Sequence, residues 1–280
     1  MLTCNLMGGL GNQLFQIFTT ISYAIKSKNS FKFLNITQLG RGATTIRFTY
    51  WDTFFSNLRL FLIDKLPDEI KVIKEKGFTF EELMFEEMKN NNILLFGYFQ
   101  SYKYFQENYT VICKLIGLEK MKLELIKKLN LSKYYVDNCI SMHFRLGDYK
   151  LLEKYHPIAT YEYYKEALTF IKNKNMGYQF TILYFCEDDD HEEVLVKIEK
   201  LALEFPEYIF TRGENTLEDW QQMLYMSLCH HNIIANSTFS WWSAYFNSHS
   251  DKIVCYPAIW FGSSANNDIK DLCPMEWKSI

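Results

Sequence analysis

A histidine, an arginine and an aspartate lie close together in the middle of the chain, in the stretch SMHFRLGDYK. The guanidinium of Arg145 is well shaped to hold a diphosphate through paired, charge-assisted hydrogen bonds. In a strand, the side chain of His143 points to the same face as that of Arg145 and could donate to the same group; the alternative is a buried core histidine. Asp148 could form an ion pair with Arg145 or act as a general base, and the ion pair is the favoured interpretation.

A second cluster, NSTFSWWSAY, places small hydroxyl side chains where a helix is predicted to begin. Ser237 or Thr238 could cap this helix, with the aromatic residues in the core. The same hydroxyls and the free N–H groups of the first turn could also bind phosphate, assisted by the helix dipole. The two roles are compatible. We therefore expect one anion-binding site lined by Asn236, Ser237, Thr238 and Ser240.

The acidic stretch CEDDD has two interpretations. Asp188 and Asp190 could hold a divalent cation. Asp189 and Glu192 also fit a capping box at the start of the next helix, where acidic residues are favoured by the helix dipole in any protein. The capping interpretation is preferred, so no metal site is predicted. Glu187 and Asp188 are expected to line the same binding site as Arg145.

A glycine-rich loop, GGLGNQ, lies between a predicted strand and a predicted helix near the N-terminus. Gly9, Gly11, Asn12 and Gln13 could present backbone N–H groups and amide side chains to an anion or a sugar. A tight turn would explain the glycines but not the two amides that open the helix. The dinucleotide-binding fingerprint requires a third glycine where this chain has Leu14, so a nicotinamide cofactor is disfavoured.

In the second half of the chain, these clusters fall at the ends of predicted strands. Apolar strands alternate there with amphipathic helices, the pattern of βαβ units. The predicted strands are 139–144, 179–185, 208–211, 232–235 and 252–256, and the predicted helices are 161–172, 191–204, 217–229 and 239–247. Such strands are parallel, and ligands of open α/β sheets bind beyond the carboxyl ends of the strands. The sequence therefore predicts a doubly wound sheet with a binding crevice at these ends.

The first half begins with the same pattern but is less regular. Its predicted elements are a helix at 14–26 and strands at 2–7, 31–34 and 92–96. A further helix is predicted to begin at Thr79, whose side chain could form a capping box with Glu82. The amphipathic stretch 119–131 is predicted to connect two domains.

The composition excludes several classes of partner. The 280 residues include 30 basic and 33 acidic side chains, and the net charge of −3 does not favour nucleic acid. Seven cysteines without a CxxC pair fit neither a disulfide framework nor a zinc site. No signal-peptide pattern and no membrane-spanning apolar run is found. We therefore expect a soluble, cytoplasmic protein with no integral membrane segment.

Together, GGLGNQLFQ, HFRLGDY and NSTFSWWSAY resemble the three signature regions of the α1,2-fucosyltransferases, glycosyltransferase family 11. YWDTFF, GYFQSYKYF and PMEWKSI add to the resemblance, which spans nearly the whole chain. It implies an α/β, GT-B-like fold with two Rossmann-like domains whose parallel sheets face each other across a cleft. The expected division is an acceptor-side domain at 1–118, a connection at 119–135 and a nucleotide-sugar-binding domain at 136–280.

The resemblance also implies a GDP-fucose donor, a glycan acceptor modified at a hydroxyl such as galactose O2, inversion, and no cofactor or metal. Arg145 would contact the β-phosphate of the donor, His143 would help fix the nucleotide, and residues 237–240 would bind phosphate or nucleotide. The loop 9–13 would lie beside the transferred sugar. Many family members carry two adjacent arginines where this chain has Arg145 and Leu146, so another GDP-deoxysugar, such as GDP-rhamnose, is an alternative donor.

The acceptor hydroxyl must lose a proton during such a transfer. Asp148 is the first candidate for the general base, followed by Glu187, Asp188 and Glu214. Two further hypotheses stay open at this point: a metal-dependent glycosyltransferase that uses Asp188 and Asp190, and a non-catalytic protein that binds sugar nucleotides or glycans.

Overall fold

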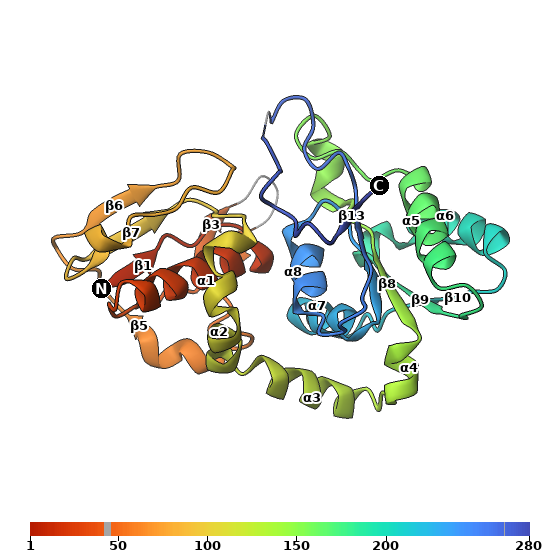
Figure 1. Ribbon diagram of the computed structural model, residues 1–280, viewed down its shortest axis with the longest axis horizontal. Helices are drawn as coiled ribbons and strands as arrows, with labels where there is room; N and C mark the ends of the chain where they lie inside the picture. The colour runs from red at the N-terminus through yellow and green to blue at the C-terminus, as the bar shows by residue number, and fades with distance from the viewer. Residues whose placement is uncertain (42–45, 266) are drawn as a thin grey trace. The chain divides into compact units, whose positions relative to one another are not determined.

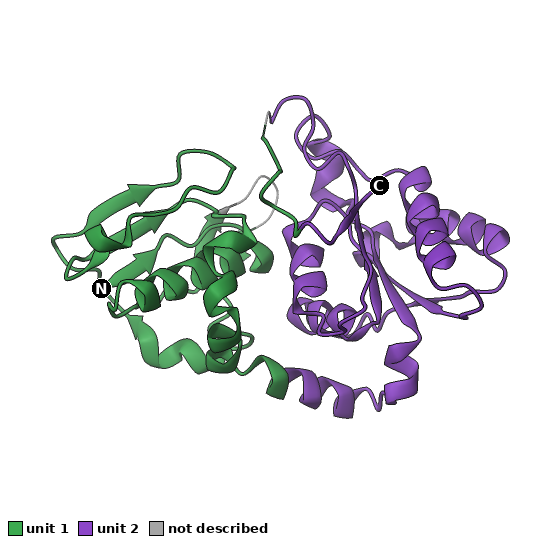
Figure 2. Ribbon diagram, in the orientation of Figure 1, with its two compact units in different colours: residues 1–120, 267–274 green, residues 121–266, 275–280 purple. Residues whose placement is uncertain are grey.

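The chain folds into two compact units, which are described separately below. The computed structural model describes residues 1–41, 46–265 and 267–280. Unit 1 comprises Met1–Lys120 and Asn267–Pro274, and unit 2 comprises Met121–Asn266 and Met275–Ile280 (Figure 2).

The end of the chain differs from the predicted division, in which 136–280 is one continuous domain. Residues 267–274 belong to unit 1. Asp271 holds this segment there, because its carboxylate pairs with Lys103 and its carbonyl oxygen accepts a hydrogen bond from the Ser101 hydroxyl at 2.6 Å. Ser101 and Lys103 each lie more than 160 positions from Asp271 in the sequence. A local sequence pattern therefore could not predict these contacts.

Unit 2 is built on a six-stranded sheet in which all neighbouring strands are parallel (Figure 1). The order is β10-β9-β8-β11-β12-β13. The strands are β8 (Cys139–His143), β9 (Thr181–Phe185), β10 (Ile209–Arg212), β11 (His231–Ile233), β12 (Val254–Tyr256) and β13 (Lys278–Ser279). The sequence predicted the first five to within two residues at each end, and missed the short β13.

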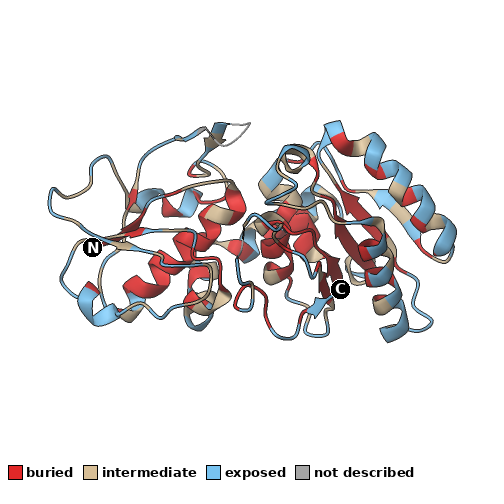
Figure 3. Cartoon of the chain, turned by 90° about the horizontal axis from the view of Figure 1, so that it is seen from above, coloured by how far each residue is buried: buried red, intermediate tan, exposed pale blue. Residues whose placement is uncertain are grey.

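Four helices cover the sheet of unit 2. They are α5 (Tyr161–Lys174), α6 (His191–Glu204), α7 (Asp219–Leu228) and α8 (Thr238–Phe246). Helices α5 and α6 lie on one face and α7 and α8 on the other (Figure 1). Ile140 and Ile182 of the sheet pack against Ala167 of α5 and Val194 of α6 in one buried apolar cluster. Buried residues accordingly concentrate on the strands and on the helix faces next to them (Figure 3). Since helices cover both faces of a parallel sheet, the predicted doubly wound α/β class is confirmed.

The order of the strands reverses beside β8. The chain passes from β8 to β9 and β10 in one direction, and then returns to β11 on the other side of β8. Ligands of open α/β sheets bind beyond the carboxyl ends of the strands at such a switch point. The loops that follow β8 and β11 are therefore the expected ligand site of unit 2.

Unit 1 contains a second parallel sheet, with the order β1-β7-β6. Its strands are β1 (Leu2–Cys4), β6 (Lys71–Lys74) and β7 (Ile93–Phe96), and the two smaller pairs are β2 (Phe33–Leu34) with β5 (Leu62–Ile63) and β3 (Gln38–Arg41) with β4 (Ile46–Phe48). Helix α1 (Leu10–Lys26) follows β1, and its side chains Leu14, Phe15 and Phe18 are fully buried. The helix begins earlier than predicted, inside the glycine-rich loop.

Three further helices lie between the two sheets in the sequence. They are α2 (Tyr109–Ile116), α3 (Leu118–Lys128) and α4 (Lys133–Asp137), and short 3-10 helices lie at Ser56–Phe61, Phe85–Met88, Tyr102–Tyr104, Gln106–Asn108, Gly147–Leu151 and Asp188–Asp190. Helix α3 runs from unit 1 into unit 2. Within the described ranges, no helix combines the length and the apolar character needed to cross a membrane.

The prediction of a helix that begins at Thr79 is wrong. The segment is irregular until the 3-10 helix at Phe85–Met88. Its backbone N–H groups donate to distant side chains: that of Glu81 to the Tyr104 hydroxyl at 3.2 Å, and that of Leu83 to the Tyr23 hydroxyl at 3.2 Å. Tertiary hydrogen bonds have replaced the helical ones.

Candidate active site

Arg145 lies two residues beyond the carboxyl end of β8, at the switch point of the sheet. Its guanidinium forms ion pairs with Asp148 and with Glu187, which follows β9. Burial alone would lower the pKa of Arg145, but the carboxylates of Glu187 and Asp148 hold that pKa above its usual value. The side chain is 20% exposed, so a permanent positive charge is fixed at the sheet edge and remains accessible.

The loop after β8 takes its shape from Gly147 and Asp190. Gly147 has φ +37°, and a Cβ atom there would lie 2.8 Å from Oε2 of Glu187. Its N–H donates to Asp190 Oδ2 at 2.7 Å, and Lys150 Nζ donates to Asp190 Oδ1 at 2.8 Å. Glycine thus allows the loop to pass over Glu187, and Asp190 anchors it.

These contacts correct the capping box predicted at the start of α6. The N-cap residue of α6 is Asp190, and no side chain caps that helix. The carboxylate of Asp190 instead accepts hydrogen bonds from the N–H of Gly147 and from Lys150. These donors belong to the loop after β8, so the sequence around Asp190 could not reveal them. Asp188 turns toward β10, where it pairs with Arg212, and this contact lowers the pKa of Asp188. Asp188 and Asp190 therefore bind different cationic side chains of unit 2.

The start of α8 lies beyond β11, the next strand along the sheet edge. Ser237 is the N-cap residue, and its hydroxyl accepts a hydrogen bond from the N–H of Phe239 at 3.3 Å. Thr238, the first helical residue, is half-buried. The amide of Asn236 donates to the carbonyl oxygens of Pro157 at 2.8 Å and Trp260 at 3.0 Å. The predicted helix start is confirmed, and Asn236 fixes the loop that leads into it.

Ser240 turns its hydroxyl into the protein. Its side chain is fully buried, and its hydroxyl donates to the carbonyl oxygens of Ala235 and Ser237, both at 3.4 Å. Four positions after Asn236, the turn of the helix directs this side chain inward. Ser237 is also buried, at 7% exposed, so Thr238 is the most accessible of the hydroxyl residues at the start of α8.

His143, the last residue of β8, is 7% exposed. Burial, assisted by the charge of Arg145, lowers the pKa of His143 to about 3, so the imidazole is neutral at physiological pH. Its ring lies 5.6 Å from that of Phe239 in α8. Nδ1 is buried and has no hydrogen-bond partner among the described residues. A neutral ring with an unused polar atom thus lies between β8 and the start of α8.

Two aromatic residues of this site were missed as functional residues by the sequence analysis. Tyr149 places its ring 5.3 Å from the guanidinium carbon of Arg145 and donates its hydroxyl to the carbonyl oxygen of Asn236 at 3.1 Å. His156 stacks on Tyr149, with ring centroids 4.8 Å apart. Burial lowers the pKa of His156; the Asp148 carboxylate opposes this effect, and Arg145 adds to it. Tyr149 belongs to the HFRLGDY motif, which was the available signal.

The glycine-rich loop lies in unit 1 and is tightly packed. Gly8 has φ +75°, and a Cβ atom there would lie 2.4 Å from Nδ2 of Asn12, whose Oδ1 accepts from Gln100 at 3.0 Å. Gln13 is fully buried, and its amide donates to the carbonyl oxygens of Gly8 at 3.1 Å and Phe48 at 2.8 Å. Asn12 and Gln13 thus stabilise the loop itself.

The two glycines predicted to face a ligand differ in their surroundings. Gly9 is the N-cap of α1, and a Cβ atom there would have no neighbour within 4 Å. Gly11 is buried within the first turn of α1. Of the predicted residues in this loop, Gly9 therefore offers the most open backbone.

Comparison with known proteins assigns the chain to a family. The model of "Glycosyl transferase family 11" matches residues 1–280. The "O-antigen biosynthesis glycosyltransferase WbnK" of Escherichia coli is 30% identical over 222 residues, which cover 75% of this chain and 70% of that protein. The "Alpha-1,2-colitosyltransferase" of Escherichia coli is 26% identical over 296 residues, which cover 98% and 97%.

Similarity to solved structures is weak. The family 9 glycosyl transferase from Veillonella parvula DSM 2008 has a TM-score of 0.45 and 10% identity, covering 100% of this chain and 84% of that one. POFUT1 in complex with GDP also has a TM-score of 0.45 and 10% identity, covering 91% and 97%. The full-length match to the family model is decisive, and the protein belongs to glycosyltransferase family 11.

Proposed function

We propose that this glycosyltransferase moves L-fucose from GDP-β-L-fucose to a hydroxyl of an acceptor glycan, galactose O2 in the first instance, with inversion at the transferred carbon. The observation that carries the proposal is the position of Arg145. A charged guanidinium lies at the switch point of the unit 2 sheet, and Tyr149 connects it to Asn236, the residue before the N-cap of α8.

Arg145 is suited to stabilise the leaving diphosphate. A guanidinium has five N–H donors, so it can hold a carboxylate and still bind a phosphate oxygen. Glu187 is the more exposed of its two partners, with 54% of the side chain accessible against 16% for Asp148. We infer that phosphate displaces Glu187, while Asp148 continues to position Arg145. The positive charge and the hydroxyls of Ser237 and Thr238 then oppose the negative charge that develops on GDP.

The proton of the acceptor hydroxyl needs a carboxylate as its destination. Asp148 and Glu187 both lie beside Arg145. Displacement of Glu187 by the diphosphate would free its carboxylate from this ion pair, so that it could turn toward the acceptor hydroxyl. We therefore retain Asp148 as a candidate base and rank Glu187 beside it.

The donor sugar has a second candidate. One relative of this chain is named an α1,2-colitosyltransferase. Colitose is L-fucose without its 3-hydroxyl group, so one pocket could accept either sugar. The second candidate function is therefore transfer of colitose or another deoxyhexose, such as rhamnose, from its GDP conjugate.

A metal-dependent reaction is less well supported. The two carboxylates that would hold a divalent cation are already paired, Asp188 with Arg212 and Asp190 with Lys150. Binding a cation there would require both ion pairs to break. We therefore propose that catalysis relies on Arg145 for the charge of the diphosphate.

The test is product formation from a panel of donors. The protein is incubated with GDP-fucose, GDP-colitose or GDP-rhamnose and a mixed set of galactose-terminated acceptors, with and without EDTA, and product masses are read. We expect fucosylated product at an unchanged initial rate in EDTA. Product from GDP-colitose alone would transfer the proposal to that donor. Binding of GDP without any product would support a non-catalytic role, and activity restored only by manganese would overturn the role given to Arg145.

A further inference from the structure

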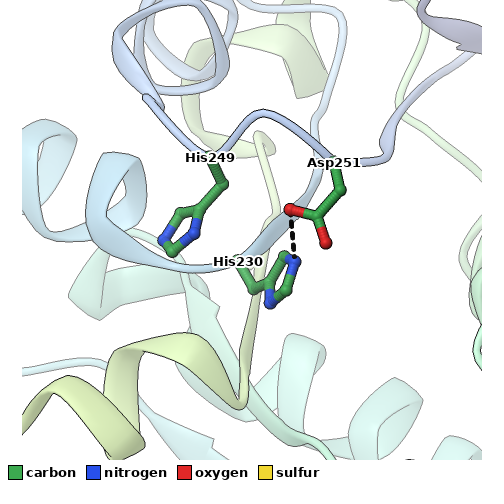
Figure 4. A group of neighbouring side chains, drawn as sticks. All are labelled: His230, His249 and Asp251. Carbon is green, nitrogen blue, oxygen red and sulfur yellow. Dashed lines mark ion pairs between the residues drawn. The ribbon is translucent and has the colours of Figure 1, made fainter.

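A cluster of two histidines and an aspartate lies in unit 2, away from the candidate active site. His230 directly precedes β11, and His249 and Asp251 lie in the loop between α8 and β12 (Figure 4). This places the cluster at the amino ends of the parallel strands, whereas Arg145 lies beyond a carboxyl end. One ligand atom from each of the three residues lies within 4.8 Å of the others.

The hydrogen bonds of the two imidazoles fix which nitrogen can bind a cation. His230 Nδ1 lies 2.8 Å from the carbonyl oxygen of Asp137, and His249 Nε2 lies 3.3 Å from that of Leu228. A carbonyl oxygen only accepts, so these nitrogens must carry the protons. The lone pairs are then on Nε2 of His230 and Nδ1 of His249. Histidines that bind metals commonly donate their other N–H to a backbone carbonyl in this way.

The contact between His230 and Asp251 requires a cation. Nε2 of His230 is buried and lies 3.1 Å from Oδ1 of Asp251. With the proton on Nδ1, a nitrogen lone pair faces a carboxylate oxygen, and two acceptors at this distance repel unless a positive charge lies between them. That charge is either a second proton on His230 or a metal ion.

We propose that His230 Nε2, His249 Nδ1 and an Asp251 oxygen form a binding site for Zn²⁺, with water as the fourth ligand. Imidazole and carboxylate are common zinc ligands, at about 2.0 to 2.2 Å, which separates tetrahedral ligands by roughly 3.4 Å. The pair of His230 and Asp251 already has nearly this spacing. The three ligand atoms lie within 4.8 Å of one another, so His249 completes the site by moving closer to the other two. Its ring now lies almost parallel to that of His230, with centroids 4.8 Å apart.

Such a site would tie together separate segments of unit 2. His230 contacts the end of α4 through Asp137, and His249 contacts the end of α7 through Leu228. The side chain of Asp251 is 73% exposed, so an ion can enter from solvent. Bound zinc is therefore expected to stabilise the fold of unit 2, independently of the donor chemistry.

The test uses untagged protein and Co²⁺, which reports a tetrahedral N/O site by its visible absorption. We expect one equivalent of Co²⁺ to bind, Zn²⁺ to displace it, and Zn²⁺ to raise the unfolding temperature. His249→Ala and Asp251→Asn should each weaken binding by at least about 100-fold, since even outer-shell changes can reach that size. His191→Ala, which removes a histidine at the start of α6, is the matched control and should bind as the original protein does.

Asp251→Asn is expected to fold normally, because it replaces an exposed side chain with one of equal size. A loss of metal binding in this variant therefore reports the lost ligand and not misfolding. Failure of the protein to bind one equivalent of Co²⁺ or Zn²⁺ would assign the cluster to a protonated His230–Asp251 ion pair alone. Binding that survives both His249→Ala and Asp251→Asn would place the metal elsewhere. Either result would overturn the proposal and leave the glycosyltransferase function untouched.

Discussion

The ring of Tyr149 lies against the guanidinium of Arg145, with 5.3 Å between the ring centroid and the guanidinium carbon. The same side chain donates its hydroxyl to the carbonyl oxygen of Asn236 at 3.1 Å. Asn236 precedes Ser237, the N-cap of α8. One tyrosine therefore connects the cation beyond β8 with the helix start beyond β11, the two parts of the proposed diphosphate site.

Tyr149→Phe tests this connection. The ring over Arg145 is kept and the hydrogen bond to Asn236 is lost, which costs about 1 kcal/mol for a neutral pair. We expect kcat/KM for the donor to fall roughly five- to tenfold, if that energy is expressed in the transition state. Tyr149→Leu also removes the cation–π contact and should cost more. Equal kinetics for the original protein and both variants would show that Tyr149 does not organise the site.

Arg145→Lys tests the cation itself. Lysine keeps the charge but loses the planar pair of donors that fits a carboxylate or a phosphate. We expect kcat to fall by about 100-fold, in the range found when one donor to a developing oxyanion is removed. Arg59→Lys is the control, because Arg59 forms an exposed ion pair with Asp52 at 3.2 Å. A turnover within threefold of the original protein for Arg145→Lys would contradict the role of this guanidinium.

Gly147→Ala tests the close approach of the loop to Glu187. The added Cβ would lie 2.8 Å from the carboxylate and would occupy a backbone conformation at φ +37°. The conformation alone costs an L-residue roughly 1 to 2 kcal/mol. We expect a drop in unfolding temperature, and a loss of activity because Glu187 and Arg145 are displaced.

Two further variants separate the causes of that loss. Gly177 also has a positive φ, +86°, but open space around it, so Gly177→Ala measures the conformational cost without the contact. Adding Glu187→Ala to Gly147→Ala removes the contact and should recover part of the stability. If Gly147→Ala is no more destabilising than Gly177→Ala, the contact with Glu187 is unimportant.

The sequence was a good guide to unit 2, because the inner strands of its sheet are mostly buried and appear as short apolar runs. Cys139 to His143, for example, are all buried. The site at the strand ends followed from the same pattern, since polar residues directly after a buried strand must lie at the edge of the sheet. Arg145 and Ser237 were identified in this way.

Local sequence patterns could not predict contacts between segments that are distant in the sequence. Thr79 and Glu82 have the spacing of a capping box, yet the Tyr23 and Tyr104 hydroxyls accept the N–H groups of that segment. Asp190 was considered only as a possible metal ligand, and it anchors a loop more than 40 positions away. His230 and His249 come together only because parallel strands share an edge.

His143 gives unit 2 a defined pH dependence. Its folded-state pKa is about 3, because burial and Arg145 disfavour the imidazolium, whereas the unfolded chain has a pKa of about 6.5. Above pH 6.5 the ring is neutral in both states, so the free energy of unfolding does not change with this group. Below pH 6.5 the unfolded state takes up the proton first, so stability falls as the pH decreases toward 3. Linkage gives a loss of roughly 2 kcal/mol at pH 5 from this residue.

His143→Gln removes the titrating group and keeps a polar side chain. Denaturant unfolding between pH 5 and 8 should show a shallower pH dependence for the variant, by up to about 1.4 kcal/mol per pH unit at the acidic end. The variant is expected to be less stable than the original protein at pH 8, because the buried ring packs near Phe239. The informative quantity is therefore the slope and not the absolute stability. Parallel pH profiles for the two proteins would mean that His143 has the same proton affinity in the folded and unfolded chains, contrary to its burial.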